Sequence, residues 1–383
     1  MNVRVVDAEE EFAALEETWE RLHERAAVAS VFSGFAWQHL WWRTYGRGAP
    51  LRLLVATDGA DVVGLLALYG STERVARVPV RSLRLVGSGG DTSPDDLGPV
   101  LAAGREQEVA HALADAIVRL PGWDVLRLDE LEPVSPFAST MARAARAAGQ
   151  RCVSGRCQRI SFTDLPDSWE GWLASLHRDR RYRVRKARKD LLAAHPDARF
   201  FLWTDPATLD AGIDRLVRLH HARWRDTGQA HGFASPEYVA FHRALMHACF
   251  ERDQLRLYGL ELGGEIVAMY YMYRFRDALY LMQTGFDPVH AKLKPGHVLL
   301  GWIIEQAIGE RLGVLDFLKG EHRYKEELAT GERETVYLTA LRNHPAAWVF
   351  GLRWLVLPAL ATPVLRALRR GPREREPTPP PGR

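Results

Sequence analysis

Cysteine is scarce in this chain of 383 residues: there are three, Cys152, Cys157 and Cys249. An odd and small number of thiols excludes a disulfide framework, and a single Cys-x4-Cys pair does not match a zinc site. The first residues lack the apolar core of a signal peptide, and no run within 1–345 is apolar enough to cross a bilayer. We therefore expect a cytoplasmic protein with thiols kept reduced and no bound metal.

Excess charge of one sign is also missing. The 51 basic and 48 acidic residues leave a net charge of +3, which is too small for a DNA-binding protein of this length. The motifs of common hydrolases, Gly-x-Ser-x-Gly and His-Glu-x-x-His, are absent. Only six basic residues are lysines, and none precedes residue 186: Lys186, Lys189, Lys292, Lys294, Lys319 and Lys325.

The rest of the composition is that of a folded globular protein, with 47% hydrophobic and 26% charged residues. The length exceeds what one hydrophobic core usually serves, so two to three domains are expected. An internal repeat indicates how they are arranged. Residues 51–69 and 255–273 align without a gap and share six identities, and each is typical of a strand, a tight turn and a second strand.

The surroundings of the two hairpins repeat as well. Before them, apolar spacing predicts helices over 8–26, 35–45, 205–226 and 236–252. After them we expect strands over 83–87 and 278–285, helices over 105–120 and 296–312, and strands over 123–128 and 314–318. The sequence therefore predicts two α/β domains of one architecture, joined near residues 150–160.

Three segments stand outside the repeat. Residues 169–195 predict a strongly basic helix, which is either a solvated face or a surface for a phosphorylated partner. Residues 346–370 form an apolar helical segment that packs on the C-terminal domain or lies on a membrane surface. Residues 371–383 are too rich in proline and charge to fold.

Residues 279–325 hold the densest candidate site. A strand ends at Thr284-Gly285, and Lys292 and Lys294 precede the Pro295-Gly296 that opens an apolar helix. Free N–H groups at a helix start, together with two cations, suit a pyrophosphate, although an ordinary loop with solvated lysines fits the spacing equally well. The loop matches neither a Walker loop nor a dinucleotide fingerprint.

Asp316 lies inside the apolar strand that follows. A buried carboxylate needs either a partner or a chemical role, and Lys319, Arg323 and Lys325 are close in sequence. A structural salt bridge and a catalytic role both remain open. Tyr324 either packs in the core or protonates a leaving group.

In combination, Gly-Phe-Asp-Pro at 285–288, Pro295-Gly296, Asp316-Phe317-Leu318-x-Gly and Tyr324-Lys325 resemble the GNAT superfamily. Within it, the chain is similar to the CelD-type acyltransferases of cellulose biosynthesis and to the FemAB-like transferases. The resemblance covers residues 155–340. It implies tandem GNAT-like domains of the α/β (α+β) class, each with a mixed, mostly antiparallel, twisted sheet flanked by helices. The expected ranges are 1–153 for a degenerate N-terminal domain, 154–345 for the acyltransferase domain, 346–370 for the apolar segment and 371–383 for the tail.

The resemblance further implies that an acyl group, in the simplest case acetyl, moves directly from acyl-CoA to an amine or a hydroxyl. The acceptor would be a cell-envelope, polysaccharide or small molecule, and the protein would be cytoplasmic or peripheral to the inner membrane face. The expected catalytic residues are Asp316, Lys319, Tyr324 and Lys325. The expected cofactor-binding residues are Gln283, Thr284, Gly285, Lys292, Lys294, Pro295, Gly296 and His297. The expected substrate-binding residues are Arg181, Arg185, Arg223 and Trp224.

Two alternatives remain open. One is a FemAB-like transferase that uses aminoacyl-tRNA as its donor, for which the basic helix would be the tRNA surface. The other is a scaffold that binds acyl-CoA without transferring it. Free thiol release from acetyl-CoA, set against labelled aminoacyl-tRNA, separates the two donors.

Overall fold

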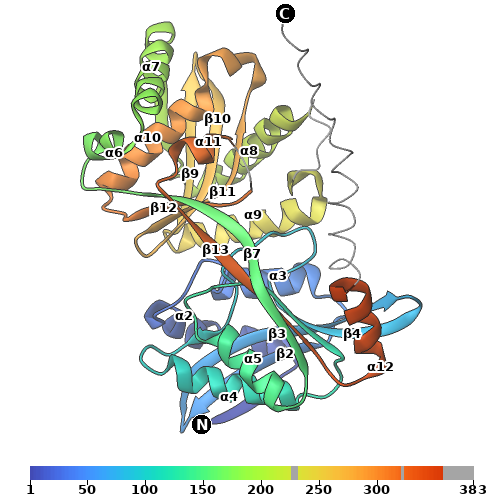
Figure 1. The fold of residues 1–383 in the computed structure, drawn as a ribbon. Helices are drawn as coiled ribbons and strands as arrows, with labels where there is room; N and C mark the ends of the chain where they lie inside the picture. The colour runs from blue at the N-terminus through green and yellow to red at the C-terminus, as the bar shows by residue number, and fades with distance from the viewer. Residues whose placement is uncertain (226–231, 321–322, 357–383) are drawn as a thin grey trace, which may run out of the picture.

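A computed structural model describes residues 1–225, 232–320 and 323–356 of the chain. The N-terminal half contains β1 (Asn2–Val6), α1 (Glu9–Ala13), α2 (Glu16–Arg25), α3 (Phe35–Tyr45), β2 (Leu51–Asp58), β3 (Asp61–Val75), β4 (Val78–Leu85), β5 (Val100–Leu101), α4 (Glu106–Arg119), β6 (Val125–Leu131) and α5 (Phe137–Ala147). These elements form the lower lobe of Figure 1.

The remaining elements form most of the upper lobe (Figure 1). They are β7 (Arg151–Asp164), α6 (Trp169–Ser175), α7 (Arg178–Ala194), β8 (Arg199–Leu202), η1 (Pro206–Thr208), α8 (Leu209–Trp224), η2 (Gly232–Ala234), α9 (Pro236–Glu251), β9 (Leu255–Leu262), β10 (Glu265–Phe275), β11 (Ala278–Phe286), η3 (Pro288–Leu293), α10 (Pro295–Gly309), β12 (Val314–Lys319), α11 (Arg323–Leu328), β13 (Gly331–Leu341), α12 (Pro345–Gly351) and η4 (Leu352–Val356).

One sheet of 13 strands runs through both lobes. Its order is β1-β2-β3-β4-β6-β13-β7-β12-β11-β10-β9-β8, with β5 beside β3. The named strands pair in parallel at β4–β6 and β11–β12, and the other pairs are antiparallel. The predicted mixed, mostly antiparallel sheet flanked by helices is confirmed.

The predicted hairpins are present as β2–β3 and β9–β10. In the second hairpin, Gly263 and Gly264 turn the chain with φ of 57° and 81°, values that glycine adopts without strain. The strand predicted to begin at Leu83 begins at Val78 instead. The longer hairpin formed by β3 and β4 could not be recognised from the sequence because its turn contains no glycine. Ala76 and Arg77 form the turn instead, with φ of 48° and 68°.

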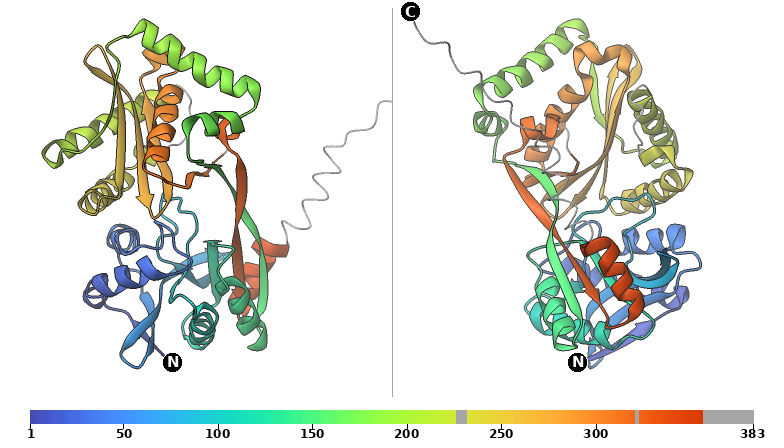
Figure 2. Two further views of the ribbon diagram at one scale, coloured as in Figure 1. Left: turned by 90° about the vertical axis from the view of Figure 1, so that its left-hand side faces the viewer. Right: turned by 45° about the vertical axis from the view of Figure 1, so that its right-hand side comes forward.

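The strand that directly follows the N-terminal elements, β7, and the last described strand, β13, each join the sheet of the opposite half. β13 pairs with β6 of the N-terminal half, and β7 pairs with β12 of the C-terminal half. The two strands also pair with each other, from Arg151↔Leu341 to Phe162↔Gly331, and form the long crossing ribbon in Figure 2. The boundary expected between residues 153 and 154 falls inside β7.

The core consists of layers on both faces of this sheet. Along β10, Met269, Tyr271 and Tyr273 face α8 and α9, while Tyr270 and Met272 face α6 and α10, as the two-residue period of a strand requires. The first layer continues into the N-terminal half, where Trp37 of α3 meets Phe241 of α9 edge to face, with ring centroids 5.0 Å apart. The two halves therefore share one core.

The apolar segment expected over 346–370 is described as far as residue 356. Ala346, Ala347 and Phe350 of α12 pack against Val75, Val80 and Val125. Residues 357–370, and the tail expected over 371–383, lie outside the described residues. Among the helices that are described, none combines the length and the apolar character needed to span a membrane.

Candidate functional site

The parallel strands β11 and β12 pair only at their beginnings. Their register covers three residue pairs, from Ala278↔Val314 to Tyr280↔Asp316. Beyond them a cavity of about 160 Å³ opens between the strands. It is lined by Trp37, Ser93, His220, Arg223, Trp224, Tyr238, His242, Leu281, Met282, Gln283, Thr284, Phe317, Leu318, Lys319 and Lys325.

A β-bulge distorts β11 beside this cavity. Tyr271 of β10 pairs with Gln283 and Met272 pairs with Leu281, so Met282 is one residue extra in the ladder. A bulge turns backbone groups away from regular pairing and commonly lies next to functional sites. Met282 itself lines the cavity.

Helix α8 packs on the same strand at unusually close range. A Cβ added to Gly285 would lie 2.4 Å from the backbone nitrogen of His220, so the structure accounts for this glycine by helix packing. The buried His220 donates its Nδ1–H to the carbonyl of Thr284 at 3.0 Å. These contacts hold α8, and with it Arg223 and Trp224, against the cavity.

The start of α10 lies beside the cavity. Lys294, at φ 53° and ψ 48°, precedes Pro295, and among the described residues no side chain caps the helix. A Cβ on Gly296 would have room, with its nearest neighbours at 3.8 and 3.9 Å, so a ligand can approach the backbone. The guanidinium of Arg223 lies 5.7 Å from the ring of Phe286, one of those neighbours. Arg223 thus lines the cavity and also contacts Phe286, which neighbours the start of α10.

Aromatic side chains form the opposite wall of the cavity. Tyr238 of α9 accepts a hydrogen bond from Gln283 Nε2 at 2.9 Å. His242 Nδ1 lies 3.0 Å from the hydroxyl of Tyr271, and burial lowers the pKa of His242 to about 3. The imidazole is therefore neutral at physiological pH.

Lys325 of α11 brings a cation to the cavity. Its ammonium donates to the carbonyls of Leu318 at 3.0 Å and Lys319 at 2.7 Å, which leaves a third proton for a ligand. Burial lowers its pKa to about 8, and the negative charges of Asp95 and Asp316 oppose that shift. The group remains largely protonated at neutral pH and changes its charge just above it.

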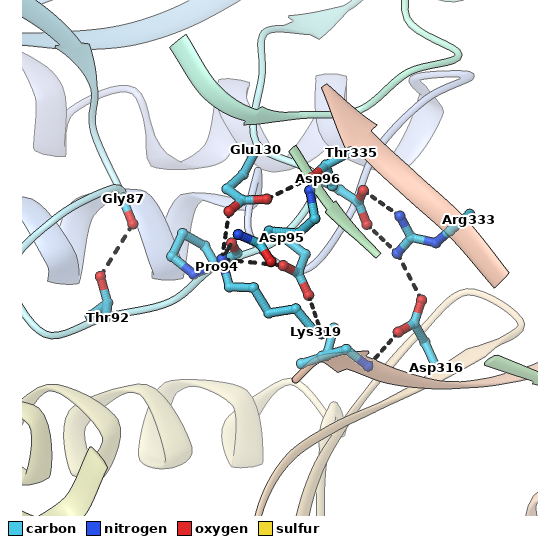
Figure 3. Close-up of polar contacts among 12 residues, drawn as sticks. Gly87, Thr92, Pro94, Asp95, Asp96, Glu130, Asp316, Lys319, Arg333 and Thr335 are labelled. Carbon is cyan, nitrogen blue, oxygen red and sulfur yellow. Dashed lines mark hydrogen bonds and ion pairs between the residues drawn. The ribbon is translucent and has the colours of Figure 1, made fainter. Parts of the chain in front are cut away.

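A buried ionic network lies behind the cavity (Figure 3). Asp316 Oδ1 accepts from the backbone N–H of Leu318 at 2.7 Å, and Oδ2 accepts from Arg333 at 2.8 Å. Arg333 also binds both oxygens of Asp96, at 2.5 Å each. The partner that a buried Asp316 requires is thus Arg333 of β13, which in turn binds the N-terminal half.

Lys319 crosses to the N-terminal half in the same network. Its ammonium donates to the carbonyl of Pro94 at 2.8 Å and to Glu130 at 2.9 Å, and it lies 3.4 Å from Asp95. Its backbone N–H donates to Asp95 Oδ2 at 2.9 Å. Burial raises the pKa of Asp95 to about 6 in spite of this cation.

The predicted site residues therefore fall into groups. Gln283, Thr284, Arg223, Trp224, Lys319 and Lys325 line the cavity, and Lys292, Lys294, Pro295, Gly296 and His297 lie at or before the start of α10. Gly285 packs against α8, and Asp316 lies behind the lining. Tyr324 belongs to α11, but its side chain lies outside the described part of the structure.

Arg181 and Arg185 are not brought to the cavity. Both lie on α7, where Arg181 donates to the carbonyls of Ala174 and Leu176 and Arg185 forms an ion pair with Glu170.

Sequence reasoning missed the cavity residues contributed by α9 and by the N-terminal half, namely Tyr238, His242, Trp37 and Ser93. It also missed Asp95, Asp96, Glu130 and Arg333 of the network. The one available signal was the pair of acids Asp95-Asp96 in a loop next to buried strands, since carboxylates there need cationic partners.

Comparison with known proteins agrees with this geometry. Residues 178–326 match the family model described as acetyltransferase (GNAT) domain. The match begins at α7 and ends within α11, so it includes both walls of the opening between β11 and β12. No curated protein matches the chain.

Several solved structures have a similar fold, and the similarity covers nearly the whole of this chain. FemX is 12% identical, with a TM-score of 0.63, over 91% of this chain and 99% of its own. The C-terminal domain of a putative lysylphosphatidylglycerol synthetase from Agrobacterium fabrum is 11% identical, with a TM-score of 0.53, over 90% and 96%. L-PGS from Bacillus licheniformis is 13% identical, with a TM-score of 0.52, over 93% and 97%.

At such identities the likeness concerns the fold alone, and the closer likeness to CelD stays a prediction. Residues 178–326 are similar to the acetyltransferase (GNAT) domain family, and the two-lobed fold as a whole is similar to that of FemX.

Proposed function

We propose that this protein is an acyl-CoA-dependent N-acyltransferase, in the simplest case an acetyltransferase. The observation that carries the proposal is the opening between β11 and β12, with a cavity inside it and the uncapped start of α10 beside it. A thioester would reach the cavity while its diphosphate binds at the helix start. The acceptor would be an amine of a cell-envelope, polysaccharide or small molecule.

The residues at the start of α10 suit the donor. The N–H groups of Gly296 and His297 belong to the first turn, whose amides have no intrahelical acceptor. The helix dipole, Lys292 and Lys294 add positive charge at the same place. Arg223 extends this charge toward the cavity. The diphosphate would bind here through backbone and side chains together.

Transfer would be direct. The nitrogen of the acceptor attacks the thioester carbonyl, so the C–N bond forms and the C–S bond breaks, and the proton lost by the amine ends on the leaving thiolate. Lys325 donates a hydrogen bond to the charge that develops on the oxygen and then on the sulfur. In this proposal the backbone at the Met282 bulge would polarise the carbonyl, since the bulge lies beside the cavity.

The other predicted catalytic residues receive different roles in this proposal. Both oxygens of Asp316 are engaged, by Leu318 and by Arg333, so we assign it the positioning of Leu318 rather than contact with the acceptor. Lys319 lines the cavity but binds Glu130 and Pro94, so it holds the two halves together.

The test is the release of free thiol from acetyl-CoA with a panel of amines. Wild-type protein should release thiol with at least one amine, and Lys325→Met should lower kcat by about a hundredfold or more. Lys189→Met, an exposed change on α7, is the matched control and should leave kcat unchanged. Tight acetyl-CoA binding without transfer to any amine would support a non-catalytic scaffold instead.

A FemAB-like transfer from aminoacyl-tRNA is the second candidate. The similarity to FemX over 91% of the chain favours it, as does α7, where Arg178, Arg180 and Lys189 form no ion pair with any described residue. Labelled aminoacyl-tRNA, with Arg178→Ala/Arg180→Ala as the variant, tests this function. Transfer from aminoacyl-tRNA combined with inert acetyl-CoA would replace our first proposal.

A further inference from the structure

The outer face of α12 and η4 is apolar and exposed. Trp348, Leu352 and Trp354 are exposed to 51%, 56% and 49%. Trp348 and Leu352 are four residues apart and share one side of the helix. Other large exposed apolar side chains of the described residues, such as Val134 and Val289, are well separated along the chain. A cluster of this kind marks an interaction surface rather than chance exposure.

This face is held rigidly on the N-terminal half. The opposite side of α12 buries Ala346, Ala347 and Phe350 against the sheet. A Cβ added to Gly351 would lie 2.8 Å from Leu341 Cδ1, so the helix sits close to β13. Because the inner side of α12 is packed, the outer side of this helix, which carries Trp348, cannot turn inward.

Exposed arginines lie on the hairpin that packs against α12 and on η4 itself. The tip of the β3–β4 hairpin lies beside α12 (Figure 1), since Val75 and Val80 pack against it. Arg74 and Arg77 at that tip are exposed and form no ion pair with any described residue. Arg353 lies between the apolar side chains, 4.8 Å from the ring of Trp354.

The sequence around this face adds positive charge and no negative charge. From Thr335 to Val356 there is no aspartate or glutamate, whereas Arg342 and Arg353 occur, and the sequence beyond the described residues continues without an acid as far as Arg373. Tryptophan prefers the boundary between lipid and water, and arginine binds anionic headgroups there. A second copy of this chain would meet the face with the same positive charges, so self-association is disfavoured.

We propose that the face formed by Trp348, Leu352 and Trp354, with Arg74, Arg77 and Arg353 around it, binds the surface of an anionic lipid bilayer. The tryptophan rings lie among the headgroups, and the arginines bind lipid phosphates. The N-terminal half then faces the membrane, while the cavity lies between β11 and β12 and has Trp37 and Ser93 of the N-terminal half in its wall. The proposal does not depend on the acyltransferase function.

Flotation with vesicles tests the proposal without any measurement of turnover. The full-length protein should float with vesicles of phosphatidylcholine and phosphatidylglycerol in equal parts and stay behind with phosphatidylcholine alone. Each arginine near an anionic surface contributes about fivefold to binding, so Arg74→Ala/Arg77→Ala should weaken it more than tenfold. Trp348→Ala/Trp354→Ala should weaken it by about tenfold, because apolar area no longer enters the interface.

Val134→Ser, which removes an exposed apolar side chain elsewhere, is the matched control and should float like the wild type. Unchanged thermal unfolding of both double variants shows that they are folded. The proposal is overturned if wild-type protein does not float with the anionic vesicles, or if it binds phosphatidylcholine vesicles equally well. It is also overturned if the tryptophan variant floats normally, or if the face proves to form a dimer that Trp348→Ala/Trp354→Ala dissolves.

Discussion

The ammonium of Lys319, at the end of β12, lies 2.9 Å from the carboxylate of Glu130 in the other half of the molecule. Together with the Arg333 contacts to Asp96 and Asp316, this pair fixes the orientation of the two lobes directly behind the cavity. The walls contributed by Trp37 and by Gln283 come from different lobes. The shape of the cavity therefore depends on buried charges of which only Lys319 lines it.

The first prediction concerns the energy of this contact. Lys319→Met leaves Asp95 and Glu130 without their cation in a buried place, and the loss of one partner of a buried ion pair costs about 3–5 kcal/mol of unfolding free energy. Denaturant unfolding measures the loss. Arg185→Met, which removes an exposed ion pair with Glu170, should change the same quantity by less than about 1 kcal/mol. Equal effects of the two changes would contradict this assignment.

The second prediction concerns Gly285. An added Cβ would lie 2.4 Å from the His220 nitrogen, so Gly285→Ala must push α8 away from β11 and should lower the unfolding free energy by about 3 kcal/mol. Gly309→Ala is the control, because nothing lies within 4 Å of its added Cβ, and its stability should stay equal or rise slightly. A tolerated Gly285→Ala with normal ligand affinity would show that the close packing is unnecessary.

The third prediction concerns the pH dependence of transfer. Because burial lowers the pKa of Lys325 to about 8, the protonated and active form should be lost as pH rises through 8, and kcat should fall on that alkaline limb. Lys325→Arg keeps the charge and should move the fall to higher pH. A pH profile of this variant identical to that of the wild type would exclude Lys325 as the group that titrates.

The lowered pKa of Lys325 also makes stability depend on pH, but stability should rise with pH where kcat falls. The folded protein binds this proton less tightly than the unfolded chain, whose lysine has a pKa near 10.5, so the cost of the buried charge is present below pH 8. It is relieved as pH rises from about 8 to about 10.5. The unfolding free energy of the wild type, relative to that of Lys325→Met, should therefore increase across this window.

The fourth prediction concerns donor binding. Lys292→Ala/Lys294→Gly removes two charges from the start of α10 and keeps the left-handed backbone at residue 294 accessible. The affinity for acetyl-CoA, measured by calorimetry, should fall by about tenfold or more at low salt, and the difference should shrink at high salt. Lys186→Ala/Lys189→Ala on α7 removes the same charge from another surface. An equal loss in this control would indicate general attraction rather than a site.

Local patterns predicted the repeating elements of the fold well. Alternating apolar residues marked both hairpins, and Pro295-Gly296 marked the start of α10, because each signal lies within a few residues of its effect. Such patterns could not predict that β7 pairs with β12 and that β13 pairs with β6. Neither strand was predicted, since β7 is largely polar and exposed, and only the assembled sheet decides which edge a strand pairs with.

In the candidate site, too, local features could be predicted from the sequence, whereas contacts between distant segments could not. Asp316 could be recognised as a buried charge in need of a partner, but its partner Arg333 is brought to it by the folded β13, and neighbours such as Lys319 turn elsewhere. The contribution of Trp37 to the cavity depends on how the lobes meet. Gly285 was expected to be a cofactor-binding residue, whereas the backbone of α8 occupies the space beside it.

The exchanged strands also bear on how the chain matures during synthesis. β6 ends at Leu131, and its neighbour β13 begins at Gly331, so two hundred further residues must leave the ribosome before this edge is covered. Until then the sheet of the N-terminal lobe is incomplete. The unpaired backbone N–H and C=O groups along the edge of β6 make this intermediate prone to aggregation. This edge of the sheet is therefore completed late, once β13 has been synthesised.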